Sequence, residues 1–232
     1  MPELFGPVHE ATLRVLARND VAVCLPRGQT CCGALHVHDG EVNKAKALAR
    51  KNILAFEGDG ADYIVVNAAG CGAALKEYGH LLQDDPVFAA RALAFSRRVV
   101  DISEFLDQLG VVAPEHPVRA RVAYDDPCHL LHGQGIKAAP RNLLRRIPGL
   151  ELVEPRDAER CCGSAGIYNI MHPDMAGRIL DEKVSNLART GASIVATGNP
   201  GCMLQIELGL RARRVPAEVV HPIELLDRAY GR

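Results

Sequence analysis

The sequence of 232 residues lacks the features that mark nucleic-acid binding, secretion and membrane insertion. Lys and Arg number 27 against 28 Asp and Glu, and there is no basic block and no interleaving of aromatic with basic residues. Nucleic acid is therefore not an expected partner. The N-terminal segment is polar and amphipathic, without the apolar core of a signal peptide, and no apolar run approaches the ~20 residues of a membrane-spanning helix. We expect a cytoplasmic protein, and peripheral association with the inner face of the membrane through a larger complex is left open.

Cysteine is abundant for such a chain, with eight residues. In a reducing compartment disulfides are disfavoured, and grouped cysteines more often bind metal or carry out redox chemistry. Two pairs are directly adjacent, at residues 31–32 and 161–162. A disulfide between neighbours in the chain strains the backbone, so these pairs are not expected to bridge. Metal binding is the better interpretation, and a purely structural thiol cluster is the alternative.

The cysteines follow an internal repeat. The motif Cys-Cys-Gly at positions 31–33 recurs at 161–163, and Cys71 in a Gly-Cys turn recurs as Cys202 at nearly the same offset. In both copies a β-like run ending at a proline precedes the Cys-Cys-Gly motif, and a strand-like run precedes the Gly-Cys turn. The spacing indicates duplication of a unit of ~130 residues and excludes a short solenoid repeat.

Each half consists of amphipathic helical segments alternating with short apolar strands. Helices are predicted near 8–18, 42–56, 140–146 and 174–190, and strands near 21–25, 63–66, 122–124, 150–153 and 194–197. This alternation is typical of βαβ units with a parallel sheet. The predicted fold class is therefore α/β, with two pseudo-symmetric halves from an internal duplication, each a Rossmann-like parallel sheet flanked by helices. We place the halves at residues 1–112 and 113–232, joined by a proline-containing segment near 110–121.

The second half has one cysteine for which the first half shows no counterpart. Cys128 precedes Cys161, and the same separation counted back from Cys31 falls just before Met1. The repeat predicts that the first site lacks its leading cysteine because the chain begins about two residues too late. A truncated chain, a misassigned start codon or a degenerate first site would each explain this.

Three residues near the motifs are interpreted as structural. Cys24 lies in an apolar β-like run at the wrong spacing to replace the missing cysteine, so we expect a buried core thiol, with a substitute ligand as the alternative. Asp125 and Asp126 precede a proline and indicate a turn or a helix start.

Four cysteines in the second half match the ligand number of a [4Fe–4S] cluster or a Cys₄ zinc site. Structural zinc sites normally space paired cysteines by two to four residues, so the vicinal pairs favour iron–sulfur and leave zinc as the alternative. The predicted ligands are Cys128, Cys161, Cys162 and Cys202 in the second half and Cys31, Cys32 and Cys71 in the first.

Glycines and histidines adjoin these ligands. Gly33 and Gly163 would let the backbone come close to an inorganic core and donate N–H groups to its sulfurs. His38 and His132 could be ligands, hydrogen-bond donors to ligands or proton carriers, or loop histidines bonded to the backbone. Lys76 and Tyr78, which follow Cys71, could line the site but are more typical of a solvated helix face.

The sequence resembles the Cys-Cys-Gly domain pair found in the cysteine-rich subunit of heterodisulfide reductase and in its relatives. Its segments are most similar to the C-terminal half of the iron–sulfur subunit of bacterial glycolate oxidase, and lactate-utilisation iron–sulfur proteins are near siblings. The segments are PRGQTCCGALHVHDG, VNAAGCGAALKEYGHLL, DPCHLLHGQGI, CCGSAGIYN and ATGNPGCMLQI, and the resemblance spans nearly the whole chain.

The resemblance implies an electron-transfer subunit with no catalytic residues of its own. It would pass electrons from an FAD-containing glycolate oxidase subunit, which oxidises glycolate to glyoxylate, toward a quinone or similar acceptor. By position, residues 31, 32 and 71 would form the first cluster site, and residues 128, 161, 162 and 202 the second.

The sequence departs from the family pattern in three ways. The ferredoxin-like domain with which the glycolate oxidase subunit opens is missing from this chain, and so is the leading cysteine of the first site. Ala74 and Gln205 stand where the heterodisulfide reductase subunit has the second cysteine of a Cys-x-x-Cys motif. The alternatives are thus a lactate-utilisation protein, a heterodisulfide-reductase-like thiol/disulfide subunit, or a zinc-binding structural and interaction module.

Overall fold

Helices and short parallel strands alternate along the chain in the computed structural model, which describes residues 2–58 and 60–231. The first half contains α1 (Pro2–Arg18), α2 (Ala34–His38), α3 (Val42–Phe56), β1 (Ile64–Val66), α4 (Ala69–Lys76), α5 (Tyr78–Leu81), α6 (Ala89–Arg98), β2 (Val99–Asp101) and α7 (Ile102–Leu109). The second half contains β3 (Ala120–Tyr124), α8 (Cys128–Leu131), α9 (Ala138–Arg145), β4 (Leu150–Val153), α10 (Tyr168–Met171), α11 (Pro173–Arg189), β5 (Ile194–Ala196), α12 (Pro200–Ala212), β6 (Glu218–Val220) and α13 (Pro222–Ala229).

All strand pairs are parallel. The second half forms a four-stranded sheet in the order β4-β3-β5-β6, and the first half a two-stranded sheet of β1 and β2. β1 and β5 occupy corresponding positions in the repeat, and each of these strands leads into a helix that carries a Gly-Cys turn. The predicted α/β class, with parallel sheets, flanking helices and a duplicated unit, is confirmed.

The strand predicted at 21–25 does not form. The segment is a loop in which Cys24 is exposed, and Leu25 retains 71% of its accessible surface. Its counterpart in the repeat is β4, which pairs with β3 alone. In the described part of the first half no strand corresponds to β3, so the apolar run has no hydrogen-bonding partner. The prediction that Cys24 is a buried core thiol was therefore wrong.

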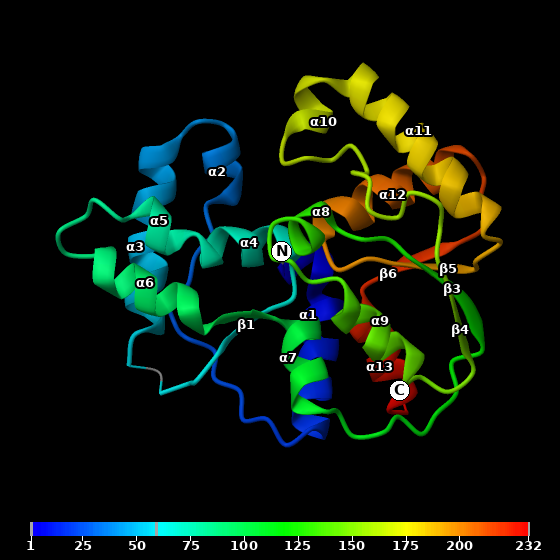
Figure 1. Cartoon of the computed structure of the whole chain (residues 1–232), viewed down its shortest axis with the longest axis horizontal. Helices are drawn as coiled ribbons and strands as arrows, with labels where there is room; N and C mark the ends of the chain where they lie inside the picture. Colours follow the sequence, from blue (N-terminus) through cyan, green and yellow to red (C-terminus); the bar gives the residue numbers. More distant parts are fainter. Residues whose placement is uncertain (1, 59, 232) are drawn as a thin grey trace.

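The main hydrophobic core joins the two halves of the chain. It includes Val15 of α1, Leu106 of α7 and Leu226 of α13, all nearly inaccessible to solvent. Arg14 of α1 reinforces this packing by donating to both carboxylate oxygens of Asp227, at 3.0 and 2.8 Å. Figure 1 shows α1, α7, α9 and α13 together below the two lobes that carry the remaining helices. The boundary after residue 112 stays a prediction about the repeat, because α1 packs with elements of the second half.

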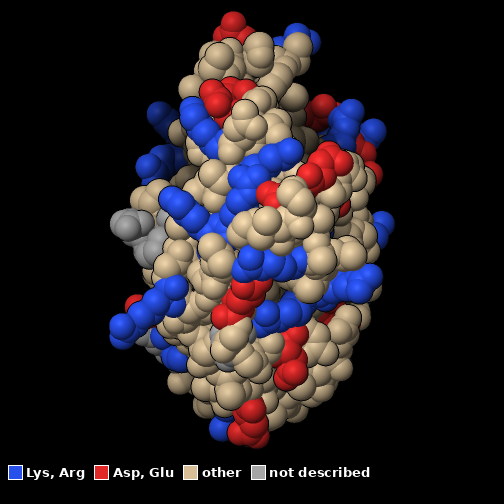
Figure 2. Space-filling model, turned by 90° about the vertical axis from the view of Figure 1, so that its left-hand side faces the viewer, with Lys and Arg blue, Asp and Glu red and all other residues tan. Residues whose placement is uncertain are grey.

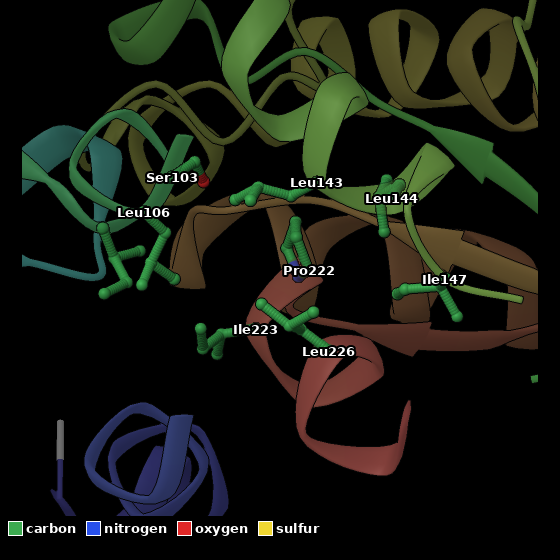
Figure 3. Close-up of a pocket in the computed structure, with 9 residues that line it drawn as sticks. Ser103, Leu106, Leu143, Leu144, Ile147, Pro222, Ile223 and Leu226 are labelled. Atoms are coloured by element: carbon green, nitrogen blue, oxygen red, sulfur yellow. The ribbon is translucent and has the colours of Figure 1, made fainter. Parts of the chain in front are cut away.

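A small cavity of about 10 Å³ lies within this core, between α7, α9 and α13 (Figure 3). Apolar side chains such as Leu106, Leu143 and Leu226 converge on it, and no cysteine is among the residues that line it. A space of this size holds at most one water molecule, and an apolar lining gives that water no partners. We interpret it as a packing void and not as a ligand site.

The surface carries charges of both signs. On the face shown in Figure 2, Lys and Arg side chains are interspersed with Asp and Glu. None of the helices in the described residues has both the length and the apolar character needed to cross a bilayer.

Candidate metal centre

Three strands lead directly to the cysteine-bearing helices. β5 is followed by α12, whose third residue is Cys202, and β1 by α4, whose third residue is Cys71. β3 continues through three residues into α8, which begins at Cys128. Parallel strands end at one edge of a sheet, and helix N-termini at that edge favour negatively charged ligands such as thiolates. The fold thus brings cysteines from distant parts of the chain to one side of the molecule.

The four predicted ligands of the second half interact with one another. Hydrogen bonds from Cys128 and Cys162 lower the pKa of Cys161, and the N–H groups of Gly163 and Ala165 add to this effect. The bond to Cys161, together with burial, raises the pKa of Cys128. Bonds with Cys161 and Cys202, together with burial, raise the pKa of Cys162. These contacts form one network of four sulfurs, with Cys161 favoured as a thiolate.

Gly163 holds the Cys161–Cys162 loop against α11. Its N–H lies 3.3 Å from the sulfur of Cys161, and its φ of +91° is a backbone conformation that side chains rarely tolerate. A Cβ at this position would lie only 2.7 Å from the carbonyl oxygen of Ala176. Gly33 repeats the arrangement in the first half, with a φ of +82° and an N–H 3.5 Å from the sulfur of Cys31.

The first half brings three cysteines together. The sulfurs of Cys32 and Cys71 are 3.2 Å apart, and hydrogen bonding from Cys32 lowers the pKa of Cys71 while raising that of Cys32. Cys31, at the exposed edge, hydrogen-bonds to Cys32 and acts electrostatically on Cys71. The exposed Cys24 interacts with none of these thiols in the described residues.

Two buried side chains that sequence analysis did not assign to the site support the Cys31–Cys32 loop. Tyr78 is 1% exposed and its hydroxyl donates to the carbonyl oxygen of Cys32 at 2.8 Å, so the interpretation of a solvated helix face was wrong. Asn52 of α3 donates to the hydroxyl of Tyr78 and to the carbonyl oxygen of Cys31, at 3.0 and 3.1 Å. These two hydrogen bonds hold the Asn52 side chain against the Cys31–Cys32 loop.

Lys183 of α11 occupies the position of the repeat that corresponds to Asn52. Its ammonium group lies 2.8 Å from a carboxylate oxygen of Asp125 and donates to the carbonyl oxygen of Ala158, three residues before Cys161. Lys183 and Asp125 are both buried, and burial raises the pKa of Asp125 against the opposing effect of the lysine. Matching helix positions thus support the cysteine loops of both halves. The first half uses the neutral hydrogen bonds of Asn52, and the second uses the buried charge of Lys183.

Asp125 and Asp126 are more than the start of a turn. Asp126 receives two hydrogen bonds of 2.7 Å from the guanidinium of Arg141, whose carbon atom lies 4.7 Å from the ring centre of Tyr124. The neighbouring α8 does begin soon after these residues, at Cys128. Their buried ion pairs with Lys183 and Arg141 anchor the segment between β3 and Cys128.

Side chains from both halves meet between the two cysteine groups. The His129 ring lies 3.7 Å from the Cys128 sulfur and 5.5 Å, centre to centre, from the ring of His38. Burial, followed by the charge of His38, lowers the pKa of His129. Asn199 contacts both halves as well, bonding to Gly70 N–H and to the Cys202 sulfur. His132 lies exposed at the end of α8, and its backbone N–H donates to the carbonyl oxygen of Cys128 at 2.8 Å.

The second-half residues fit an iron–sulfur cluster by their chemistry. Four cysteine sulfurs are the donors that such a cluster takes, and the backbone N–H of Gly163 donates to the sulfur of Cys161. In residues 2–58 and 60–231, no three His, Cys, Asp or Glu side chains surround a point where one metal ion could be held. Zinc in place of a cluster is the alternative that metal analysis must decide.

Comparison with known proteins agrees with this geometry. The sequence profile described as the CCG cysteine-rich domain matches twice, at residues 2–76 and 122–207. The chain belongs to the cysteine-rich domain family. Each match contains one Cys-Cys-Gly motif and one Gly-Cys turn, so the family assignment covers both sites.

Individual relatives support the same assignment. The chain is 43% identical over 237 residues to the probable glycolate oxidase iron–sulfur subunit of Bacillus subtilis, covering 100% of this chain and 53% of that protein. It is 32% identical over 225 residues to lactate utilization protein A of Exiguobacterium sp., covering 97% and 92%. It is 38% identical over 223 residues to a subunit of the fumarate reductase (CoM/CoB) of Methanothermobacter marburgensis, covering 95% and 43%. The chain therefore spans about half of the first relative and most of the second.

Proposed function

We propose that this chain is an iron–sulfur electron-transfer subunit of a 2-hydroxy-acid oxidoreductase, with glycolate as the substrate of the complex. The observation that carries the proposal is that Cys128 and Cys202 lie in the first turns of the helices that follow the paired strands β3 and β5, with the Cys161–Cys162 pair beside them. It is supported by the printed name of the Bacillus subtilis relative, a probable glycolate oxidase iron–sulfur subunit.

A [4Fe–4S] cluster bound by these sulfurs would take up and release one electron at a time. The chain's own residues would provide ligands, orient them and shield them from water. Cys162 and Cys202 are 3% and 5% exposed, so the inner side of the site is dry, whereas Cys128 and Cys161 are partly accessible. The accessible side would face the donor or acceptor of electrons. FAD would lie on a partner subunit, and a ferredoxin-like domain or subunit would complete the path.

The first half supports the same role less completely. Cys31, Cys32 and Cys71 provide three thiols, one fewer than a cluster with four cysteine ligands requires. We propose that a ligand other than these three thiols completes this site when it is loaded. Lactate in place of glycolate is the second candidate for the substrate, because the chain covers 92% of the Exiguobacterium lactate utilization protein A.

The test is to isolate the intact complex anaerobically from its own cells by a tag on this chain. Glycolate or lactate is then added, and the broad visible absorbance of the cluster is followed. We expect glycolate to bleach the absorbance and an acceptor quinone to restore it. Bleaching by lactate alone would favour the second substrate, and an absorbance that neither acid changes would contradict the proposed function.

Two variants control this experiment. Cys161→Ser removes the thiol that the network favours as a thiolate, so its complex should lose the part of the bleaching absorbance that the second-half cluster contributes, while the flavin still bleaches. Cys24→Ser removes an exposed cysteine with no contact to either group and should bleach like the wild type.

A further inference from the structure

Asn199 stands at the start of α12 but does not cap that helix. Asparagine at an N-cap normally accepts a hydrogen bond from an N–H of its own first turn. Here the side-chain oxygen accepts the N–H of Gly70 at 3.0 Å. Gly70 is the second residue of α4, the helix that carries Cys71, so Asn199 caps a helix of the other half.

Helix α4, which receives this cap, has no side-chain cap from its own N-cap residue. Its N-cap residue is Ala68, which has no side-chain acceptor. Ala68 also corresponds to Asn199 in the repeat, because each lies three positions before the cysteine of its Gly-Cys turn. The first N–H of α4, from Ala69, donates to the carbonyl oxygen of Gly198 at 3.0 Å. Residues 198 and 199 thus satisfy the two N–H groups that open the Cys71 helix.

The other end of the same amide points at a predicted ligand. The side-chain nitrogen of Asn199 donates to the sulfur of Cys202 at 3.4 Å. The two contacts fix the amide orientation, because an N–H can be accepted only by its oxygen, which turns the NH₂ group toward the sulfur. Gly201 leaves room for this arrangement, since a Cβ there would lie 2.9 Å from the hydroxyl of Ser164 and 3.5 Å from the Asn199 nitrogen.

We propose that Asn199 is a positioning residue that couples the two cysteine sites. It holds the Cys71 helix against the Cys202 turn, and its N–H···S bond raises the reduction potential of the cluster held by the second half. Hydrogen bonds to ligand sulfurs stabilise the more negative reduced state and are among the determinants of cluster potential. The redox part rests on the proposed function, whereas the capping part does not.

Three variants separate the two contacts. Asn199→Ala removes both. Asn199→Asp keeps an oxygen to accept the Gly70 N–H but replaces the donor to Cys202 with a negatively charged group. Asn169→Ala is the matched control, because Asn169 also donates a 3.0 Å side-chain bond in the second half, but to Gln205 and not to a cysteine.

The first measurement uses the full chain without metal, kept reduced, and follows hydrogen exchange of the Gly70 amide by NMR. In Asn199→Ala we expect this amide to exchange at least tenfold faster than in the wild type. In Asn199→Asp and Asn169→Ala it should stay within a factor of about three. An unchanged Gly70 exchange rate in Asn199→Ala would overturn the capping role.

The second measurement is a potentiometric titration of the cluster-loaded full chain, monitored by electron paramagnetic resonance. We expect Asn199→Ala to lower the potential by on the order of 59 mV, which is a tenfold change in a one-electron equilibrium, and Asn199→Asp to lower it further. Asn169→Ala should titrate like the wild type. Wild-type potentials in both Asn199 variants would overturn the redox part. If the wild-type chain holds no cluster, the proposed function and the redox part both fail, and Gly70 exchange still decides the capping role.

Discussion

At the scale of the residue, His221 and Asp101 illustrate how burial sets the charge of single side chains. His221 begins α13 by accepting the N–H of Ile223 at 3.1 Å, and Asp101 begins α7 by accepting the N–H of Ser103 at 2.8 Å. Burial lowers the pKa of His221 to about 3 and raises that of Asp101 to about 6. Asp101 is the last residue of β2 and His221 directly follows β6, so groups with opposite pH responses begin the helix after the last strand of each half.

We predict that His221 makes the chain less stable as the pH falls from 7 to 5. The unfolded imidazole binds a proton below about 6.5, whereas the folded one stays neutral until about pH 3. The contribution of His221 therefore lowers the free energy of unfolding by about 2 kcal/mol between pH 7 and pH 5. His221→Asn keeps a capping oxygen and should remove this dependence, as measured by urea unfolding under reducing conditions.

The comparison must be made between variant and wild type, because Asp101 acts in the opposite direction. Its raised pKa means that the folded state takes up a proton first, so Asp101 favours folding as the pH falls from about 6 to about 4. Since Asp101 is present in both proteins, its effect cancels in the difference. Equal pH slopes for the wild type and His221→Asn would contradict the assignment of a neutral, buried imidazole.

A second prediction at this scale concerns the buried pair of Lys183 and Asp125. Lys183→Met leaves the Asp125 carboxylate without its cation in the core, and we expect a loss of about 3–5 kcal/mol in the free energy of unfolding. Adding Asp125→Asn should restore part of it, because a neutral amide is less costly to bury unpaired. Lys137→Met, at an exposed position, should change the stability by less than about 0.5 kcal/mol. If Lys183→Met alone were as stable as the wild type, the pair of Lys183 and Asp125 would not be buried.

These residues also show what the sequence alone could not indicate. Lys183 and Asn52 lie at matching positions, but a lysine and an asparagine in helices are ordinarily exposed, and nothing in their neighbours marks them as supports of a loop. The burial of Tyr78 has no local signal either. By contrast, the grouping of the cysteines was indicated by the sequence, because their spacing repeats and free thiols in such numbers need a chemical reason, and their role as ligands stays a prediction.

At the scale of the element, the Cys-Cys-Gly loops depend on close contact with the helix that follows. Gly163 approaches α11 so closely that any side chain would meet backbone atoms. Gly33 approaches Ala45 of α3 in the same way, at 3.3 Å for an added Cβ. The glycine of the motif therefore packs the loop onto a helix and also donates its N–H to the sulfur of the first cysteine of the motif.

We predict that Gly163→Ala destabilises the chain by several kcal/mol and abolishes metal loading in the second half. Both a left-handed backbone with φ of +91° and a clash with the Ala176 oxygen contribute to the loss. Gly40→Ala is the control, because Gly40 has a φ of +77° but no atom within 4 Å of an added Cβ. It should cost about 1 kcal/mol and leave loading intact. Similar losses in the two variants would mean that the contact with α11 has no role.

The strand predictions were correct where the neighbouring strand of the sheet is present. Strands near 122–124, 150–153 and 194–197 form and pair, because each has a neighbour in the four-stranded sheet. The segment 21–25 has the same apolar character and fails, since a strand needs a hydrogen-bonding partner that its own residues cannot provide. Cys24 became exposed for the same reason, and local sequence could not have revealed this.

At the scale of the whole molecule, the duplication has produced two cysteine sites that are alike in position and different in composition. The second site unites four cysteines, two of them almost fully buried, and the first unites three in a more open setting. The common core through α1, α7, α9 and α13 makes the two halves one folding unit in the described residues. Function was predicted from motifs that the fold then brought together, and the contacts between the halves, such as that of Asn199, emerged only in three dimensions.

The central claim, that the second half binds an iron–sulfur cluster through its four cysteines, is tested most directly by metal and sulfide analysis after anaerobic purification. The account predicts about four irons and four acid-labile sulfides per chain from the second site. Cys161→Ser should lose them, whereas Cys24→Ser should keep them. Zinc without acid-labile sulfide, or iron and sulfide that persist undiminished in Cys161→Ser, would contradict it.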